Sequence, residues 1–295
     1  MSLSKSDLNS VSHSLKRVER KELIVMAKQW SNEELLILKE YYPTENRDKA
    51  YELIPNRSKE SIRRKASSMN LSSDRINYVK REFNRDYFKV IDNANKAYWL
   101  GFIYADGYIE VNNLLGFRLK DNDVNHLNKF AKEINFNGEA KIEEYKYKES
   151  SYKVSRLTIC GRDFVQSLKD LGLTVNKTLT IEFPHIREDL ISHFVRGYFD
   201  GDGCIGIYKD RGYNKVLFSV VSGSESFVQS IKSYLEKFGN DKLAIRKTGN
   251  AYELRCQSLE KIKSTLDVIY KESNTENRLD RKYEIYLKFK ETFSK

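Results

Sequence analysis

The chain has 295 residues and is basic, with 52 lysines and arginines against 42 aspartates and glutamates and a formal net charge of +10. This charge favours a polyanionic partner, nucleic acid before a membrane surface, and no apolar run is long enough to span a membrane. Three widely spaced cysteines without a Cys-x-x-Cys pair argue against a disulfide framework and a zinc site. The N-terminus lacks the layout of a secretory signal, so we expect a soluble intracellular protein of two or three domains.

Residues 1–28 are a polar segment, and residues 29–75 are expected to form a small domain of three helices. The sequence Trp-Ser-Asn-Glu-Glu at 30–34 supplies a helix cap and an acidic first turn. The first helix would end at Pro43, and its apolar face would comprise Leu35, Leu36, Leu38 and Tyr42. A second helix is expected over about 48–53, and a third from the N-cap Ser58 to Met69.

The third of these helices carries a basic run, Arg63, Arg64 and Lys65, mostly on its outer side. Three short helices with a tryptophan near the start and a basic third helix resemble the Myb/SANT-like helix-turn-helix modules. The resemblance implies that the third helix enters a major groove of DNA. The alternative is a small helical domain whose basic helix is only solvated. Residues 76–90 follow as a connector with some structure, because they contain neither glycine nor proline.

A short pattern then occurs twice, starting at residues 98 and 194. The first copy reads Tyr-Trp-Leu-Gly-Phe-Ile-Tyr-Ala-Asp-Gly, and the second reads Phe-Val-Arg-Gly-Tyr-Phe-Asp-Gly-Asp-Gly. Each copy is an apolar helical stretch with two small residues four positions apart, Gly101 with Ala105 and Gly197 with Gly201. Small residues at this spacing let two helix backbones approach closely, and the glycine after each aspartate is expected to stop its helix in the left-handed conformation.

If the two helices pack side by side in parallel, Asp106 and Asp202 meet at one end. A carboxylate at a helix C-terminus is disfavoured by the helix dipole, and a second carboxylate adds repulsion. A hard divalent cation bound by carboxylate and backbone carbonyl oxygens would compensate, and Mg²⁺ is favoured because it binds through few carboxylates together with substrate phosphates. The arrangement therefore indicates a metal-dependent phosphodiester site.

The two motifs resemble those of the LAGLIDADG homing endonucleases, in the single-chain form that carries both copies, over about residues 90–295. The resemblance implies an α+β fold of two pseudo-symmetric αββαββα halves, 91–190 and 191–295, which form a saddle over double-stranded DNA. It implies two or three Mg²⁺ ions, which Mn²⁺ can replace. Their ligands would be the carboxylates of Asp106 and Asp202 and the backbone carbonyl oxygens of Ala105 and Gly201.

One position departs from the family pattern. The first motif has Tyr104 where an acidic residue is common, whereas the second has Asp200. The final aspartate is kept in both copies.

Each half is expected to repeat one order of elements after its motif helix. In the first half a hairpin of 108–111 with 114–120 precedes a helix at 121–134, a hairpin of 140–148 with 152–160 and a helix at 162–171. In the second half the corresponding segments are 204–208 with 215–221, 224–238, 242–247 with 251–257, 259–270 and a last helix from about Glu276.

Strand alternation assigns a face to each strand residue. Leu115, Phe117 and Leu119 should point at the helices, and so should Leu157, Ile159, Ile205, Ile207, Ile245 and Leu254. The residues left on the outer, DNA-facing side include Arg118, Lys120, Arg156, Tyr208, Arg246 and Arg255. A two-stranded ribbon fits a major groove, where arginine reads guanine. The alternative is that these charges serve solubility and protect the sheet edges.

The family also implies a basic residue from each half near the scissile phosphates. Lys177 in Asn-Lys-Thr matches that position in the first half, with an ordinary loop lysine as the alternative. In the second half the match is Lys282, with its neighbour Arg281 left open. The histidines show no metal-ligand spacing, and we expect most of them at or near the surface: His13, His126, His185 and His193.

The predicted function is a site-specific, metal-dependent double-strand DNA endonuclease that hydrolyses one phosphodiester per strand. The resemblance implies a monomer with a long target site, a four-base 3′ overhang and a mobile-element role in a phage, a bacterium or an organelle. The chain begins Met-Ser and ends Phe-Ser-Lys, without intein splicing residues, so we expect an intron-encoded or free-standing protein. The alternatives are a non-cleaving DNA-binding regulator or an intron-RNA maturase on the same fold, which usually lose one or both acids.

Overall fold

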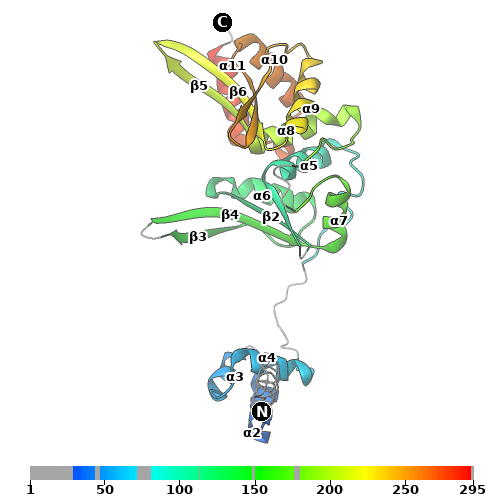
Figure 1. Cartoon of the computed structure of the whole chain (residues 1–295), viewed down its shortest axis with the longest axis vertical. Coiled ribbons are helices and arrows are strands. Elements are labelled where there is room, and N and C mark those ends of the chain that lie inside the picture. The colour runs from blue at the N-terminus through cyan, green and yellow to red at the C-terminus, as the bar shows by residue number, and fades with distance from the viewer. Residues whose placement is uncertain are drawn as a thin grey trace, which may run out of the picture. The chain divides into compact units, whose positions relative to one another are not determined.

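The computed structural model describes residues 29–43, 47–71, 81–111, 113–147, 150–175 and 180–293. The chain divides into two compact units, Met1–Lys80 and Arg81–Lys295, each with its own hydrophobic core (Figure 1). Within the described ranges, no helix has the combination of length and apolarity that crossing a lipid bilayer requires.

The smaller unit contains three helices: α2 (Asn32–Tyr41), α3 (Arg47–Leu53) and α4 (Lys59–Ser68). Ser31 caps α2 in a capping box with Glu34, and Ser58 caps α4, as the sequence predicted. The side chains of this core are Leu38, Tyr42, Ile54, Ile62 and Ala66.

The prediction that Leu36 faces this core is wrong, because its side chain is 63% exposed. Leu38 is fully buried, and residues two positions apart on a helix do not share a face.

The larger unit repeats one order of elements, which confirms the predicted α+β fold of two halves. The first half contains α5 (Ala94–Asp106), β1 (Gly107–Glu110), β2 (Leu114–Lys120), η1 (Asp121–Asp123), α6 (Val124–Glu133), β3 (Lys141–Tyr147), β4 (Ser150–Cys160) and α7 (Arg162–Asp170). The second contains η3 (Glu188–Leu190), α8 (Ile191–Asp202), β5 (Gly203–Asp210), β6 (Tyr213–Ser222), α9 (Glu225–Glu236), β7 (Ala244–Thr248), β8 (Ala251–Cys256), α10 (Leu259–Tyr270), η4 (Thr275–Asn277) and α11 (Asp280–Thr292).

Each half has one antiparallel four-stranded sheet, and the two sheets have equivalent strand orders, β1-β2-β4-β3 and β5-β6-β8-β7. The first residue of each sheet is the glycine that follows a motif aspartate, and it pairs with Phe117 in one sheet and Val220 in the other. The strands therefore leave the motif helices in the same way in both halves.

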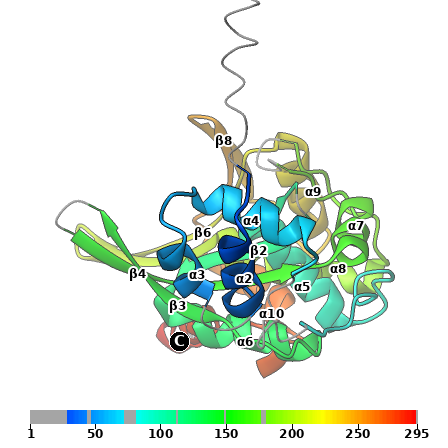
Figure 2. The same ribbon diagram turned by 90° about the horizontal axis from the view of Figure 1, so that it is seen from below.

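The predicted inward residues are buried where helices cover the sheet. Phe117, Ile159 and Leu254 are fully buried. The prediction for Ile207 is wrong, because its side chain is 39% exposed. The far end of the ribbon of β5 and β6 projects past the helices, on the same side as the ribbon of β3 and β4 (Figures 1 and 2). Alternation places Ile207 on the inner face, but its exposure shows that this face is not fully covered there.

The described part of the predicted connector packs on the first half. The amide of Asn84 donates to the carbonyl of Ile134 at 2.7 Å, and Phe83 lies edge-on to Phe164 with ring centroids 5.2 Å apart. The larger unit therefore begins at Arg81, and residues 76–80 lie outside the described ranges.

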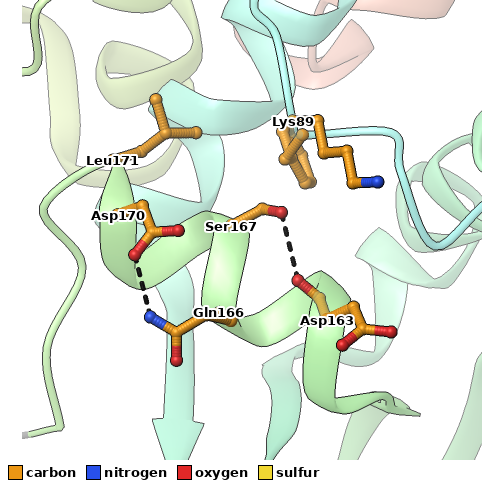
Figure 3. Close-up of a pocket in the computed structure, with 7 residues that line it drawn as sticks. Lys89, Asp163, Gln166, Ser167, Asp170 and Leu171 are labelled. Atoms are coloured by element: carbon orange, nitrogen blue, oxygen red, sulfur yellow. Dashed lines mark hydrogen bonds between the residues drawn. The ribbon is translucent and has the colours of Figure 1, made fainter.

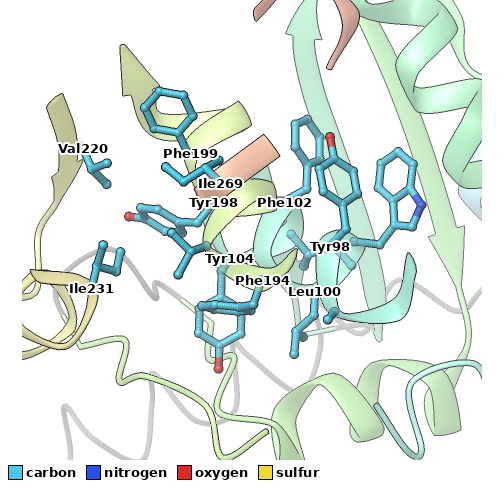
Figure 4. Packing of buried hydrophobic residues seen from close by; sticks show 14 of the residues in the cluster. Tyr98, Leu100, Phe102, Tyr104, Phe194, Tyr198, Phe199, Val220, Ile231 and Ile269 are labelled. Carbon is cyan, nitrogen blue, oxygen red and sulfur yellow. The ribbon is translucent and has the colours of Figure 1, made fainter. Parts of the chain in front are cut away.

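An aromatic core surrounds α5 and α8, where the two halves meet. Five aromatic side chains of this core are buried: Tyr98, Phe102, Phe194 and Phe199 are 0% exposed, and Tyr198 is 1% exposed (Figure 4). Large apolar area at this contact fixes the two motif helices against each other.

Candidate active site at the seam of α5 and α8

The helices α5 and α8 pack with their backbones in contact. A Cβ atom on Gly101 would lie 2.0 Å from the carbonyl oxygen of Phe194, and a Cβ atom on Gly197 would lie 1.9 Å from that of Tyr98. The reciprocal distances follow from the pseudo-two-fold relation of the halves. The predicted close approach at these glycines is therefore confirmed, and side chains of any size are excluded there.

The two motif aspartates lie at the same end of this seam. A Cβ atom on Gly201 would lie 2.3 Å from the Cβ of Ala105 and 3.0 Å from Oδ2 of Asp106. The helices thus run parallel, and the Asp106 carboxylate lies beside the last turn of α8, which ends at Asp202. Asp106 is half-buried and Asp202 is exposed.

The charges of both motif aspartates affect the pKa of one tyrosine, Tyr198. Burial raises the pKa of Tyr198, and the negative charges of Asp202 and Asp106 raise it further. Both aspartates are therefore within electrostatic range of the same side chain.

The glycines that follow the two aspartates do not adopt the predicted left-handed conformation. Gly107 has φ of −77° and Gly203 has φ of −95°, and each starts a strand directly. Glycine is required at these two positions because there is no room for a side chain. A Cβ atom on Gly107 would lie 2.8 Å from the carbonyl oxygen of Ile103, and one on Gly203 would lie 2.5 Å from that of Phe199.

The acid that only the second motif carries is buried and does not face the paired aspartates. Asp200 accepts hydrogen bonds from the hydroxyls of Tyr98 at 2.9 Å and Tyr270 at 2.8 Å, and from the amide of Leu279 at 2.7 Å. Burial raises the pKa of the Asp200 carboxyl, and the nearby Lys282 and these donors oppose that shift. In the first motif, the buried Tyr104 hydroxyl donates instead to the carbonyl of Leu171.

The two candidate basic residues of the second half have different partners. Lys282 is 7% exposed, and its Nζ donates to backbone carbonyls at the end of α8. Arg281 forms a bidentate ion pair with Asp123 of the first half at 2.8 and 2.9 Å, and its side chain remains 45% exposed. No local sequence pattern marks Asp123 as a partner of Arg281, so this residue was not predicted. Lys177 lies outside the described residues.

Among the described residues, no three His, Cys, Asp or Glu side chains gather into a metal-binding group. A cation at the seam would therefore depend on two carboxylates, backbone carbonyl oxygens and oxygens from a substrate. Mg²⁺ commonly binds in this way.

The predicted DNA-facing residues lie on the outer faces of the two sheets. Arg118 and Lys120 are exposed, and Arg156 is half-buried and 3.3 Å from Glu143. Arg118 is paired across the strands with Arg156, which is paired in turn with Lys141, so three cations form one row.

The second sheet has a similar outer face. Tyr208 is 43% exposed, Arg246 is exposed, and Arg255 is half-buried beside Glu253 at 3.8 Å. In register, Arg255 occupies the position in β8 that Thr158 occupies in β4, and Glu253 occupies the position of Arg156.

In the smaller unit, Arg63 and Arg64 are exposed on α4 and lie 3.8 and 3.1 Å from Glu60, while Lys65 is half-buried. The role of these residues in DNA binding stays a prediction.

A cavity of about 540 Å³ lies against α7, with Lys89, Asp163, Gln166, Ser167 and Asp170 around it (Figure 3). Its polar groups bond within the helix, since Gln166 donates to Asp170 at 2.8 Å and Ser167 to the carbonyl of Asp163 at 3.1 Å. Leu171, whose carbonyl accepts from Tyr104 of α5, also lines this cavity, but neither Asp106 nor Asp202 does.

Residues 189–273, from the turn before α8 to just beyond α10, match the family model described as the LAGLIDADG-like domain. This stretch is a LAGLIDADG-like domain. It contains Asp202 and the whole second sheet. The first half repeats the element order and the strand order of this LAGLIDADG-like domain, with α5 in the place of α8.

Comparison with known proteins finds further similarities. The chain is 25% identical over 184 residues to the probable translation initiation factor IF-2 of Methanocaldococcus jannaschii, across 57% of this chain. The chain spans only 14% of the length of that curated relative.

Two solved structures are also similar to this chain. The homing endonuclease I-WcaI bound to its DNA recognition sequence is 19% identical, with a TM-score of 0.46, over 68% of this chain and 91% of that one. Full-length DUF199/WhiA from Thermatoga maritima is 18% identical, with a TM-score of 0.42, over 70% and 63%.

Proposed function

We propose that this protein is a site-specific, metal-dependent double-strand DNA endonuclease. The observation that supports the proposal best is the pair Asp106 and Asp202 at the parallel ends of two helices in backbone contact. Such a fixed pair suits the binding of divalent ions, and when bound these ions would activate water and stabilise the leaving 3′ oxygen.

The residues at the seam fit a bound Mg²⁺ ion. Carboxylate and backbone carbonyl oxygens are ligands that Mg²⁺ prefers, and the Asp106 carboxylate lies beside Gly201 of α8, where a Cβ atom would be 3.0 Å from its Oδ2. The proposed ligands are the carboxylates of Asp106 and Asp202 with the backbone carbonyls of Ala105 and Gly201. The Gly201 carbonyl oxygen also accepts from Lys282 Nζ at 3.2 Å, so the ion would use its second lone pair. Two or three ions are proposed, with Mn²⁺ as a substitute.

The remaining chemistry is orientation of the DNA. The cationic row of Arg118, Arg156 and Lys141, and Arg246 and Arg255 in the other sheet, would bind phosphates and base edges of a long target. Because one chain supplies both halves of the seam, a monomer suffices. In the smaller unit, Arg63, Arg64 and Lys65 are proposed to contact flanking DNA.

A second candidate is a DNA-binding regulator or an intron-RNA maturase on the same fold. The observation that favours it is the burial of Lys282, whose Nζ faces backbone carbonyls. A nuclease would have to cut without that ammonium at the scissile phosphate.

One experiment separates the two candidates. The full chain is incubated with Mg²⁺ and DNA that carries the uninterrupted sequence flanking its own gene. We expect one defined double-strand cut with a four-base 3′ overhang, abolished by EDTA. Site-specific binding without a cut in either Mg²⁺ or Mn²⁺ would instead identify the non-cleaving protein.

A further inference from the structure

The ammonium group of Lys282 is enclosed by the end of α8. Its Nζ donates to the carbonyl oxygens of Phe199 at 2.7 Å, Gly201 at 3.2 Å and Gly203 at 2.5 Å. A lysine ammonium has three N–H donors, so each donor has a backbone acceptor. The side chain is also 7% exposed, which leaves little surface for a substrate.

The position of these carbonyls relates Lys282 to one motif aspartate. Gly201 and Gly203 are the two neighbours of Asp202 in the chain. Lys282 therefore binds the backbone on both sides of Asp202, where α8 ends and β5 begins. The last carbonyls of a helix lack partners within the helix and carry the negative end of its dipole, so a cation there is stabilising.

The electrostatic surroundings explain how a buried lysine is tolerated. Burial lowers the pKa of the Lys282 ammonium, and the negative charge of Asp200, followed by those of Asp106 and Asp202, opposes that shift. A buried charge with complete hydrogen bonding is much less costly than one without partners.

The adjacent residue extends this anchorage to the other half. Arg281 is held by Asp123 of the first half, whose side chain is 5% exposed. At the start of α11, Arg281 thus binds the first half and Lys282 binds the end of α8.

We propose that Lys282 is a positioning residue that fixes the backbone of Asp202 at the α8–β5 junction, and that it does not touch the DNA. The consequence for metal binding rests on the proposed function, whereas the anchorage itself does not. A lysine that acted on a phosphate or a water molecule would need at least one N–H directed away from the protein.

The first test measures hydrogen exchange of the DNA-free full chain. The amide of Gly203 donates to the same Phe199 carbonyl that Lys282 binds. We expect Lys282→Met to speed exchange at residues 202–205 by about tenfold, because the junction opens locally without global unfolding. Lys288→Met is the matched control, since Lys288 is exposed on the same helix. Unchanged exchange in Lys282→Met would overturn the proposal.

A conservative variant covers the case in which Lys282→Met does not fold. Arginine also donates several N–H groups to carbonyl oxygens, so Lys282→Arg should fold and keep exchange at residues 202–205 within about threefold of wild type. Lys282→Arg that folds but loses this protection completely would contradict the proposed anchorage.

The second test measures cleavage as a function of Mg²⁺ concentration. A displaced Asp202 should raise the half-saturating Mg²⁺ concentration of Lys282→Met about tenfold, while the maximal rate at high Mg²⁺ returns toward wild type. A lower maximal rate with unchanged half-saturation would show that Lys282 acts directly on the substrate. If the wild-type protein cuts no DNA, the proposed function fails, and the exchange result still decides the anchorage.

Discussion

His126 and His193 are buried, with 3% and 4% of their surfaces exposed. The expectation that most histidines lie near the surface is therefore wrong for these two. On α6, His126 Nε2 lies 3.0 Å from the hydroxyl of Tyr98, which donates in turn to Asp200. His193 Nδ1 accepts from Arg196, which is fully buried on α8. Both rings belong to polar networks that need a neutral imidazole acceptor or donor in a fixed place.

The first prediction concerns the pH dependence of stability. Burial lowers the pKa of both histidines, for His126 together with the positive charges of Lys129 and Arg281. Below about pH 6.5 the unfolded chain binds more protons at these rings than the folded chain does, so stability falls as the pH drops. The free energy of unfolding should decrease by up to about 1.4 kcal/mol per pH unit for each ring.

Urea unfolding between pH 7.5 and 5.5 measures this decrease. His126→Gln should reduce the slope by about half, whereas His185→Gln, which changes an exposed residue, should leave it unchanged. Equal slopes for His126→Gln and wild type would contradict the assignment.

At the scale of elements, the seam between α5 and α8 is the most constrained contact. The second prediction is that Gly101→Ala or Gly197→Ala lowers the free energy of unfolding by about 3 kcal/mol or more, because even a methyl group would overlap the facing backbone. Thermal unfolding measures the loss. Gly206→Ala is the control, because its Cβ would lie 3.4 Å from the nearest atom, the Cβ of Leu217. Wild-type melting of either seam variant would show that the helices do not pack in this way.

A second contact between the halves is the pair of Arg281 with Asp123. The third prediction is that Asp123→Asn lowers the free energy of unfolding by about 1–3 kcal/mol, because it leaves a partly buried guanidinium without its charged partner.

Asp280→Asn provides the comparison. Asp280 also bridges the halves, to Lys129 at 2.6 Å, but its side chain is 52% exposed, so its loss should be below about 1 kcal/mol. Equal losses of unfolding free energy in Asp123→Asn and Asp280→Asn would indicate that burial does not decide the strength of these two ion pairs.

The sequence predicts those elements whose cause is local. Glycine spacing indicated the seam at Gly101 and Gly197, and alternation along β2 placed Phe117 inside and Arg118 outside. The ribbon at Ile207 was mispredicted because alternation gives a face but not the extent of the helices that cover it.

Contacts between residues far apart in the chain could not be predicted from the sequence. The charge problem at the two helix ends was assigned to a metal ion, but at α8 a lysine from the far end of the chain already lies on the carbonyls. Neither this contact nor that of Asp123 with Arg281 has a local signal.

At the scale of the whole molecule, the two units have separate cores. One core contains residues between Leu38 and Ala66, and the other begins at Tyr87. The fourth prediction is that a chain lacking residues 1–80 folds, binds DNA more weakly and shows a salt dependence reduced by about two to three units of slope, because the contacts of Arg63, Arg64 and Lys65 are lost.

Binding isotherms at several salt concentrations measure this change. At high concentration the shortened chain should still cut at the same phosphates, since the seam lies wholly within the larger unit. Unchanged affinity and slope, or cleavage elsewhere, would show that the smaller unit has another role.

The central claim is that Asp106 and Asp202 together hold the catalytic metal ions. The most direct measurement is strand-specific cleavage by Asp106→Asn and Asp202→Asn on the DNA that the wild-type protein cuts, with binding measured in parallel. Each change removes a charged metal ligand with little change of shape, so both variants should fold, bind the DNA with affinities within about threefold of wild type and leave at least one strand intact. Cleavage of both strands at the wild-type rate by either variant would contradict the account.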